Sequence, residues 1–267
     1  MITTYILYMC LGAFAGVLAG LLGIGGGLVI VPMLNIAFEL QHFPDVHIQH
    51  VALGTSMATI IFTSISSMRA HHKRGAINYQ AFWKLTPGII IGTYLGAWLA
   101  SILSTMVLKI FFGLFLYYVA TKMLTGKKTE AARDLPATPG MVGAGTGIGI
   151  FSALVGIGGG TLTVPFLSWC NLTMHTAIGT AAAVGLPIAL AGTAGYLING
   201  LGVTGIPGPH IGYIYLPAFL GIIVMSVITA PYGAKLAHSL PVAKLKRIFA
   251  ILLYLVATRM LWSAFGA

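Results

Sequence analysis

Two short glycine runs are the residues in this chain whose type and spacing best suggest chemistry. They read Gly23-Ile24-Gly25-Gly26-Gly27 and Gly156-Ile157-Gly158-Gly159-Gly160. Three glycines followed by β-branched residues and a proline interrupt a helix, because glycine is flexible and proline removes a backbone hydrogen bond. A broken helix offers free N–H groups at the positive end of its dipole, which favours an anion. We therefore predict that an anion contacts Gly25, Gly26, Gly27, Gly158, Gly159 and Gly160.

A second motif, H-x-A-[LI]-G-T, follows each glycine run, at 50–55 and again at 175–180. Its hydroxyl groups could donate hydrogen bonds to the anion, and its histidines could add a charge that titrates near neutral pH. Thr161 and Thr163 offer further hydroxyls. The alternative is structural, with glycines for close helix crossing and histidines at span ends. We predict that the substrate-binding site also includes Thr55, Ser56, Thr180, His50 and His175.

The two glycine runs belong to a duplication of the whole chain. Gly156 follows Gly23 by 133 positions, and Val164-Pro165 follows Val31-Pro32 by the same interval. Matching stretches at 119–124 and 256–261 close the two copies. We expect a first half at 1–125, a basic loop between the halves at 126–139, and a second half at 140–267.

The composition indicates an integral membrane protein of the all-α class. The chain has 267 residues, of which 58% are hydrophobic and only 7% are charged, whereas soluble domains carry roughly 25% charged residues. The apolar runs are long and continuous, unlike the alternating strands of a membrane barrel. The net charge of +10 lies in short loops, as the positive-inside rule predicts. We therefore expect a lipid bilayer as partner and no nucleic acid.

We expect about eight transmembrane helices, four in each half, and each half opens with a glycine-broken helix. A stripe of small residues in each opening helix should pack closely on another helix; the stripes are Gly12, Gly16 and Gly20, and Gly145, Gly149 and Ala153. The expected spans lie at about 4–23, 48–68, 82–103, 105–124, 141–172, 175–198, 211–238 and 246–265.

The sequence leaves the relative orientation of the two halves open. If each broken helix crosses the membrane, the halves are parallel and the basic turn at 244–247 lies outside, against the positive-inside rule. If each broken segment turns back inside the membrane, the halves are inverted and the same turn lies inside. Four clean long spans in each half favour the first arrangement, and the charges favour the second.

The absent motifs exclude several classes of function. All four acidic residues, Glu39, Asp45, Glu130 and Asp134, fall outside the expected apolar cores, whereas cation-coupled carriers place acids inside the membrane. The chain has no HExxH, GxSxG, CxxC or G-K-[ST] motif. We expect no enzymatic activity, no cofactor and no metal site.

The two copies of G-[IV]-G-G-G-x3-V-P, each followed by A-[LI]-G-T, resemble the sulfite exporter TauE/SafE family over essentially the whole chain. This resemblance implies a multi-pass permease of the cell inner (plasma) membrane with two homologous halves. It also implies transport, often export, of small sulfur-containing anions. Only the glycine motifs can be matched residue by residue.

We therefore expect a secondary membrane transporter, an exporter of small inorganic or organosulfur anions such as sulfite or sulfonates, that works by alternating access. Discontinuous helices in repeated halves are the best sequence sign of a carrier site. The alternatives are an anion channel, which would not saturate, and a membrane assembly protein without transport. We also consider a homodimer as the assembly of the protein.

Overall fold

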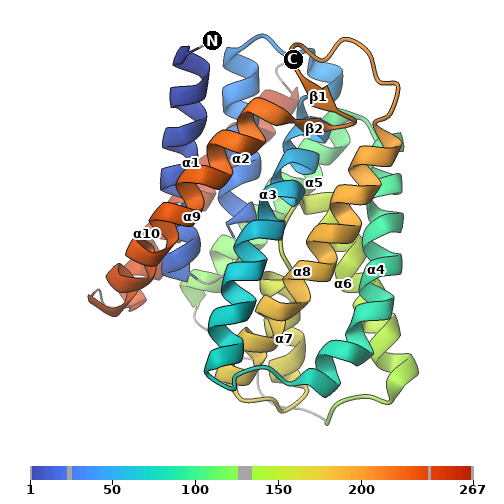
Figure 1. The fold of residues 1–267 in the computed structure, drawn as a ribbon, viewed down its shortest axis with the longest axis vertical. Coiled ribbons are helices and arrows are strands. Elements are labelled where there is room, and N and C mark those ends of the chain that lie inside the picture. The colour runs from blue at the N-terminus through green and yellow to red at the C-terminus, as the bar shows by residue number, and fades with distance from the viewer. Residues whose placement is uncertain (1, 23–25, 126–133, 240–241, 266–267) are drawn as a thin grey trace.

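The computed structural model describes residues 2–22, 26–125, 134–239 and 242–265, and for 2–4, 18–22, 230–231, 233–239 and 242–246 it describes the backbone only. In these residues the chain forms ten helices and one two-stranded hairpin (Figure 1). The expectation of an all-α membrane protein is confirmed. The elements are α1 (Ile2–Leu22), α2 (Gly27–Leu40), α3 (Asp45–Lys73), α4 (Tyr79–Ile102), α5 (Thr105–Thr125), α6 (Thr138–Val155), α7 (Gly160–Trp169), α8 (Met174–Asn199), β1 (His210–Ile211), β2 (Ile214–Tyr215), α9 (Leu216–Ser239) and α10 (Val242–Phe265).

Six of these helices, α3, α4, α5, α6, α8 and α10, are long and apolar enough to cross a membrane, and shorter apolar stretches lie in α1, α2 and α9. The boundaries differ clearly from the expected ones in three places. The basic turn expected at 244–247 is helical, because α10 starts at Val242. Glu39, expected in a loop, lies in the last turn of α2, and the expected span from Ile211 begins instead with a hairpin, so that α9 starts at Leu216. The greater part of the expected basic loop, at 126–133, lies outside the described residues.

Both broken segments turn back. The Tyr8 hydroxyl near the start of α1 donates to Gln41, just beyond the end of α2, across 3.1 Å, so α1 and α2 are antiparallel. In the second segment α6 runs beside α4 in the same direction, and α7 returns along α8 toward the end where α8 begins (Figure 1). The structure therefore has the re-entrant geometry that the sequence left open.

The glycine stripes form the closest helix contacts. A Cβ added at Gly12 would lie 2.7 Å from the Cα atom of Ile222 in α9, and one at Gly149 would lie 2.6 Å from the backbone nitrogen of Thr93 in α4. Only glycine allows backbones to approach this closely. The predicted packing role of these stripes is confirmed for Gly12, Gly16, Gly145 and Gly149. The surroundings of Gly20 are outside what the structure describes.

Each principal helix pairing has a counterpart when α1 to α5 are matched in order with α6 to α10. α1 packs on α9, and α6 packs on α4. α2 packs on α3, and α7 packs on α8. The central pair α3–α8 and the pair α5–α10 each join an element to its own counterpart.

Basic residues gather at the end of the bundle where α3 and α5 end and α4, α6 and α8 begin. Lys109 and Arg259 lie toward the opposite end. The described basic residues at the first end are Arg69, Lys73, Arg74, Lys84, Lys122, Lys235, Lys244, Lys246 and Arg247. The sequence at 126–133, which lies outside the described residues, contains Lys127, Lys128 and Arg133.

Candidate substrate site at the glycine breaks

The two glycine breaks meet in the middle of the bundle. A Cβ added at Gly27 would lie 2.7 Å from the carbonyl oxygen of Gly156 and 2.9 Å from the Cα atom of Ile157. The Ser56 hydroxyl of α3 donates to the same Gly156 carbonyl across 2.9 Å and is fully buried. The structure therefore brings Gly27 and Ser56 of the predicted site together with the second break. Gly25 lies outside the described residues.

Left-handed backbone at two glycines produces the breaks. Gly26 has φ 73° and caps the start of α2, where its carbonyl accepts the N–H groups of Val29 and Ile30, each across 3.0 Å. Gly156 has φ 66° and ends α6. Residues with a Cβ are strained in this conformation. The N–H groups before Val29 in α2 and before Thr163 in α7 come too early in their helices for an intrahelical acceptor, so a ligand could accept from them.

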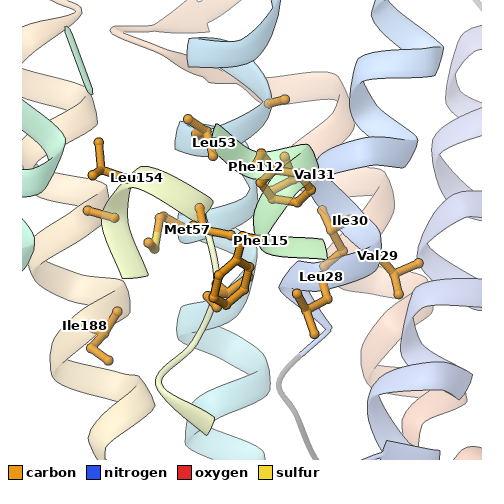
Figure 2. Close-up of a cluster of buried hydrophobic side chains, with 14 of the residues drawn as sticks. Leu28, Val29, Ile30, Val31, Leu53, Met57, Phe112, Phe115, Leu154 and Ile188 are labelled. Atoms are coloured by element: carbon orange, nitrogen blue, oxygen red, sulfur yellow. The ribbon is translucent and has the colours of Figure 1, made fainter. Parts of the chain in front are cut away.

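Apolar side chains enclose the start of α2. Leu28, Val29, Ile30 and Val31 are all buried there. Figure 2 shows them beside apolar side chains from α3, α5, α6 and α8. This break therefore offers backbone N–H groups to a site but no polar side chain from its own first turn. The neighbouring side chains that the figure labels are Leu53, Met57, Phe112, Phe115, Leu154 and Ile188.

The start of α7 carries hydroxyl groups instead. Thr163 is fully buried, and neither its hydroxyl nor that of Thr161 has a hydrogen-bond partner. A Cβ added at Gly159 would lie 3.0 Å from Oγ1 of Thr163, so this hydroxyl lies over the glycine break. A buried hydroxyl without a partner loses about 1–3 kcal/mol of hydration. A ligand with acceptor oxygens at this position would recover that loss.

Thr55 and Thr180 occupy matching positions in which each holds a connecting loop. The backbone N–H of Tyr215, at the end of the hairpin, donates to Oγ1 of Thr55 across 3.0 Å. The backbone N–H of Asn78, before α4, donates to Oγ1 of Thr180 across 2.9 Å. The two threonine hydroxyls thus tie loops to α3 and α8.

The glycine of each H-x-A-[LI]-G-T motif completes this arrangement. A Cβ at Gly54 would lie 2.6 Å from the Tyr213 carbonyl oxygen, and one at Gly179 would overlap the Ala76 carbonyl oxygen. In each motif the glycine thus admits a loop carbonyl, and the threonine accepts the N–H of the residue two positions further along that loop. This pattern gives the G-T pair a structural role that sequence reasoning missed.

The two predicted histidines lie at the ends of their helices. His50 is buried, and its Nε2 lies 3.0 Å from the Ala100 carbonyl oxygen and 3.1 Å from that of Leu103, so this nitrogen is the donor. His175 is exposed in the first turn of α8. At 1.5 Å per helical residue, His50 is about 9 Å along α3 from Ser56.

Sequence reasoning missed a charged cluster near one end of the bundle. Nζ of Lys109, a buried residue of α5, lies 2.9 Å from Oε1 of Glu39, whose Oε2 lies 3.4 Å from Arg259. A single lysine within an otherwise apolar span is a signal that could have revealed it, because charges in membrane helices have partners or functions.

The sulfite exporter TauE/SafE family matches residues 8–260 of this chain. A probable membrane transporter protein of Haemophilus influenzae is 39% identical over 97% of this chain and 99% of its own length. The probable membrane transporter protein YunE of Bacillus subtilis is 26% identical, over 97% and 98%. No solved structure matches the chain.

These likenesses confirm the resemblance found in the glycine motifs. They also agree with the apolar helices in describing a multi-pass membrane protein, located in bacteria in the plasma membrane. The chain belongs to the sulfite exporter TauE/SafE family of membrane transporters.

Proposed function

We propose that this protein is a secondary carrier that exports a small anion, sulfite or an organosulfonate, by alternating access. The observation that carries the proposal is the meeting of two broken helices at Gly27 and Gly156, beside two hydroxyls without partners at the start of α7. Broken helices at the centre of a bundle are the usual site of a carrier substrate.

The donors at this site suit an oxyanion. The free N–H groups of α7 and the hydroxyls of Thr161 and Thr163 are all able to donate. Hydrogen bonds to a charged group contribute about 1.5–3 kcal/mol each, so three or four of them can replace much of the hydration of a sulfite or sulfonate group. Glu39 and Asp45, the described acids of the membrane helices, lie toward one end of the bundle. They leave the centre free of carboxylate repulsion.

The pairing pattern supports two inverted halves, at 1–125 and 140–267. An inverted repeat explains why α1 packs on α9 in the way that α6 packs on α4. The basic end of the bundle is then the cytoplasmic end by the positive-inside rule, and Lys244, Lys246 and Arg247 fall there, at the start of α10. A negative interior favours anion exit by about 2.3 kcal/mol per charge per 100 mV.

Alternating access is supported by the unequal state of two equivalent glycines. Gly26 and Gly159 occupy the same place in the two motifs, yet Gly26 is left-handed and Gly159 is right-handed, with φ −55°. A carrier with inverted repeats holds its halves in different states at each end of its cycle. In our proposal, Gly26 is right-handed and Gly159 is left-handed in the other end state of the transport cycle.

Flux into or out of proteoliposomes tests the proposal. Purified protein should move radiolabelled sulfite or a sulfonate faster than empty vesicles do, with saturation and counter-transport. Chloride and sulfate complete the panel and define selectivity. An anion channel would instead give flux that does not saturate, and absence of flux for every anion would refute the transporter.

A glycine pair then tests the position of the site. Gly159→Val places atoms against Ile188, Val184 and the Thr163 hydroxyl, whereas Gly147→Val, in α6, meets open space. We expect Gly159→Val to lose most of the flux and Gly147→Val to keep it, with both proteins monodisperse. Equal flux in the two variants would refute the assignment of the site.

A further inference from the structure

A second polar feature lies toward the end of the bundle opposite the basic loops. It is a cavity of about 390 Å³ between the start of α3, the turn from α4 to α5, and the end of α10. Lys109, His47, Ser104, Thr105, Ser263 and Tyr213 are among its lining residues. Such a group of donors around an open cavity differs from the apolar faces that a lipid covers.

Lys109 is the charged residue that makes this cavity unusual. Its side chain is buried, and its Nζ lies 2.9 Å from Oε1 of Glu39 and 3.4 Å from Oγ of Ser263. A buried ion pair is weak evidence of stabilisation, because apolar residues of the same size often stabilise as well or better. Lys109 and Ser263 both line the cavity, so a solute there would lie close to the ammonium group.

Glu39 is held by a second cation, and this makes Lys109 available. Its other oxygen, Oε2, lies 3.4 Å from the Arg259 guanidinium, which is half exposed. An incoming anion could therefore bind Lys109 while Glu39 remains paired with Arg259. The exchange leaves no buried carboxylate without a partner, which would otherwise be strongly unfavourable.

The other lining groups add donors and moderate the affinity. Tyr213 lies in the hairpin outside the spans, where burial raises the pKa of its phenol. Its hydroxyl therefore stays protonated and able to donate. Asp45 also lines the cavity, and its carboxylate opposes an anion. The positive charges of Lys109 and Arg259 equal the negative charges of Glu39 and Asp45. An anion therefore binds only by replacing Glu39 at Lys109, and its binding is weak. Weak binding suits a transport pathway, from which the anion must also be released.

We propose that this cavity is an anion subsite at the outer end of the transport pathway, where a small oxyanion displaces Glu39 from Lys109. The choice of oxyanion rests on the proposed function. The exchange itself rests on the Lys109–Glu39–Arg259 geometry. Sulfonate and sulfite groups offer Lys109 the same kind of charged oxygen as the carboxylate that they replace.

Protection of a cysteine in the cavity tests the subsite without any need for transport. Cys10→Ser and Cys170→Ala remove the native thiols, and Ser104→Cys places a new one at the exposed rim. Its labelling by a methanethiosulfonate reagent is followed in purified protein, with ethanesulfonate against chloride at constant ionic strength. Ethanesulfonate should slow the labelling, and Lys109→Met should raise the half-protecting concentration at least about tenfold, the loss of one charged hydrogen bond.

Lys122→Met is the matched control, because Lys122 lies near the other end of α5 and is exposed. It should keep the protection of the parent protein. Equal protection in Lys109→Met and Lys122→Met, or no protection in the parent, would overturn the subsite. Gly159→Val in the same background should lose flux but keep protection, which separates a failure at the central site from a failure here.

Glu39→Gln provides a second test that does not depend on the folding of Lys109→Met. The substitution removes the competing carboxylate, so ethanesulfonate should protect at a concentration severalfold lower than in the parent. An unchanged or higher half-protecting concentration would show that the anion does not replace Glu39, and the proposal would be wrong.

Discussion

The two glycine breaks have the same five residues but different surroundings. At the start of α2, Gly26 is left-handed and the following turn is buried among apolar side chains. At the start of α7, Gly159 is right-handed and the following turn is partly exposed and carries two hydroxyls without partners. The motif therefore determines that a helix breaks, while its neighbours determine which groups surround the break.

The difference follows from two positions in the duplicated sequence. Leu28 and Ile30 in the first copy stand where Thr161 and Thr163 stand in the second. The first copy gains apolar burial, worth about 1.5–3 kcal/mol for each large side chain, and the second keeps polar groups that need a partner. In our proposal the first break supports the site and the second provides its side-chain donors.

The largest expected effect is on the contact between the breaks. Gly27→Ala places a methyl group against the Gly156 carbonyl and the Ile157 backbone. Backbone cannot rotate away as a side chain can, so we expect a loss of about 3 kcal/mol of stability, or about 6–12 °C in melting temperature. Thermal unfolding in detergent measures it. Gly158→Ala, whose Cβ meets only Ile60 at 3.4 Å, should change little; equal losses would contradict the close contact.

The next effect separates binding from packing at the second break. Thr163→Val removes a hydroxyl with almost no change in shape. We expect substrate flux to fall about 10- to 100-fold, since one charged hydrogen bond contributes about 1.5–3 kcal/mol. Stability should stay the same or rise, because a buried hydroxyl without a partner is removed. Ile30→Val, at the equivalent position of the first break, is the control and should keep its flux. A destabilised Thr163→Val with normal flux would give Thr163 a structural role.

Composition and local pattern were enough to predict the helical membrane fold, because apolar length and small-residue stripes act within one helix. Gly12 and Gly149 pack as their spacing predicts. The turning back of both breaks could not be predicted, since the same glycines permit a straight, kinked or reversed chain. That choice depends on distant contacts such as Tyr8 with Gln41 and α1 with α9.

The sequence indicated the glycines of the candidate site and the nearby hydroxyls of Ser56, Thr161 and Thr163, but not the partners of the other polar residues. The partners of Thr55 and Thr180 lie 160 and 102 residues away in the sequence, and no local pattern shows that a loop occupies these hydroxyls. Lys109 was overlooked for a similar reason, because Glu39 is 70 residues away and was placed in a loop. Long-range pairing in space decided all three cases.

A smaller effect is expected where the two G-T pairs hold their loops. Thr55→Val leaves the buried N–H of Tyr215 without an acceptor, which should lower stability by about 1–3 kcal/mol. Thr180→Val leaves the N–H of Asn78 without its acceptor. Asn78 is less buried than Tyr215, so water can replace the lost hydroxyl, and we expect a loss of stability of about 1 kcal/mol or less. Melting temperatures of the two variants compare the ends of the bundle directly. A larger loss in Thr180→Val would reverse the assigned order.

The smallest effect is expected at the two histidines that open the H-x-A-[LI]-G-T motifs. His175 is exposed in the first turn of α8, and His175→Gln should change stability by less than about 0.5 kcal/mol. His50→Gln should lower it by about 1 kcal/mol, because the His50 ring nitrogen donates to the Ala100 and Leu103 carbonyls at the end of α4. The pH profile of flux gives a second readout. If His175 carried a coupled proton, His175→Gln would flatten that profile. We expect the profile to stay unchanged, because His175 is about 14 Å along α8 from Val184 and about 20 Å from Ile188, the residues that face Gly159.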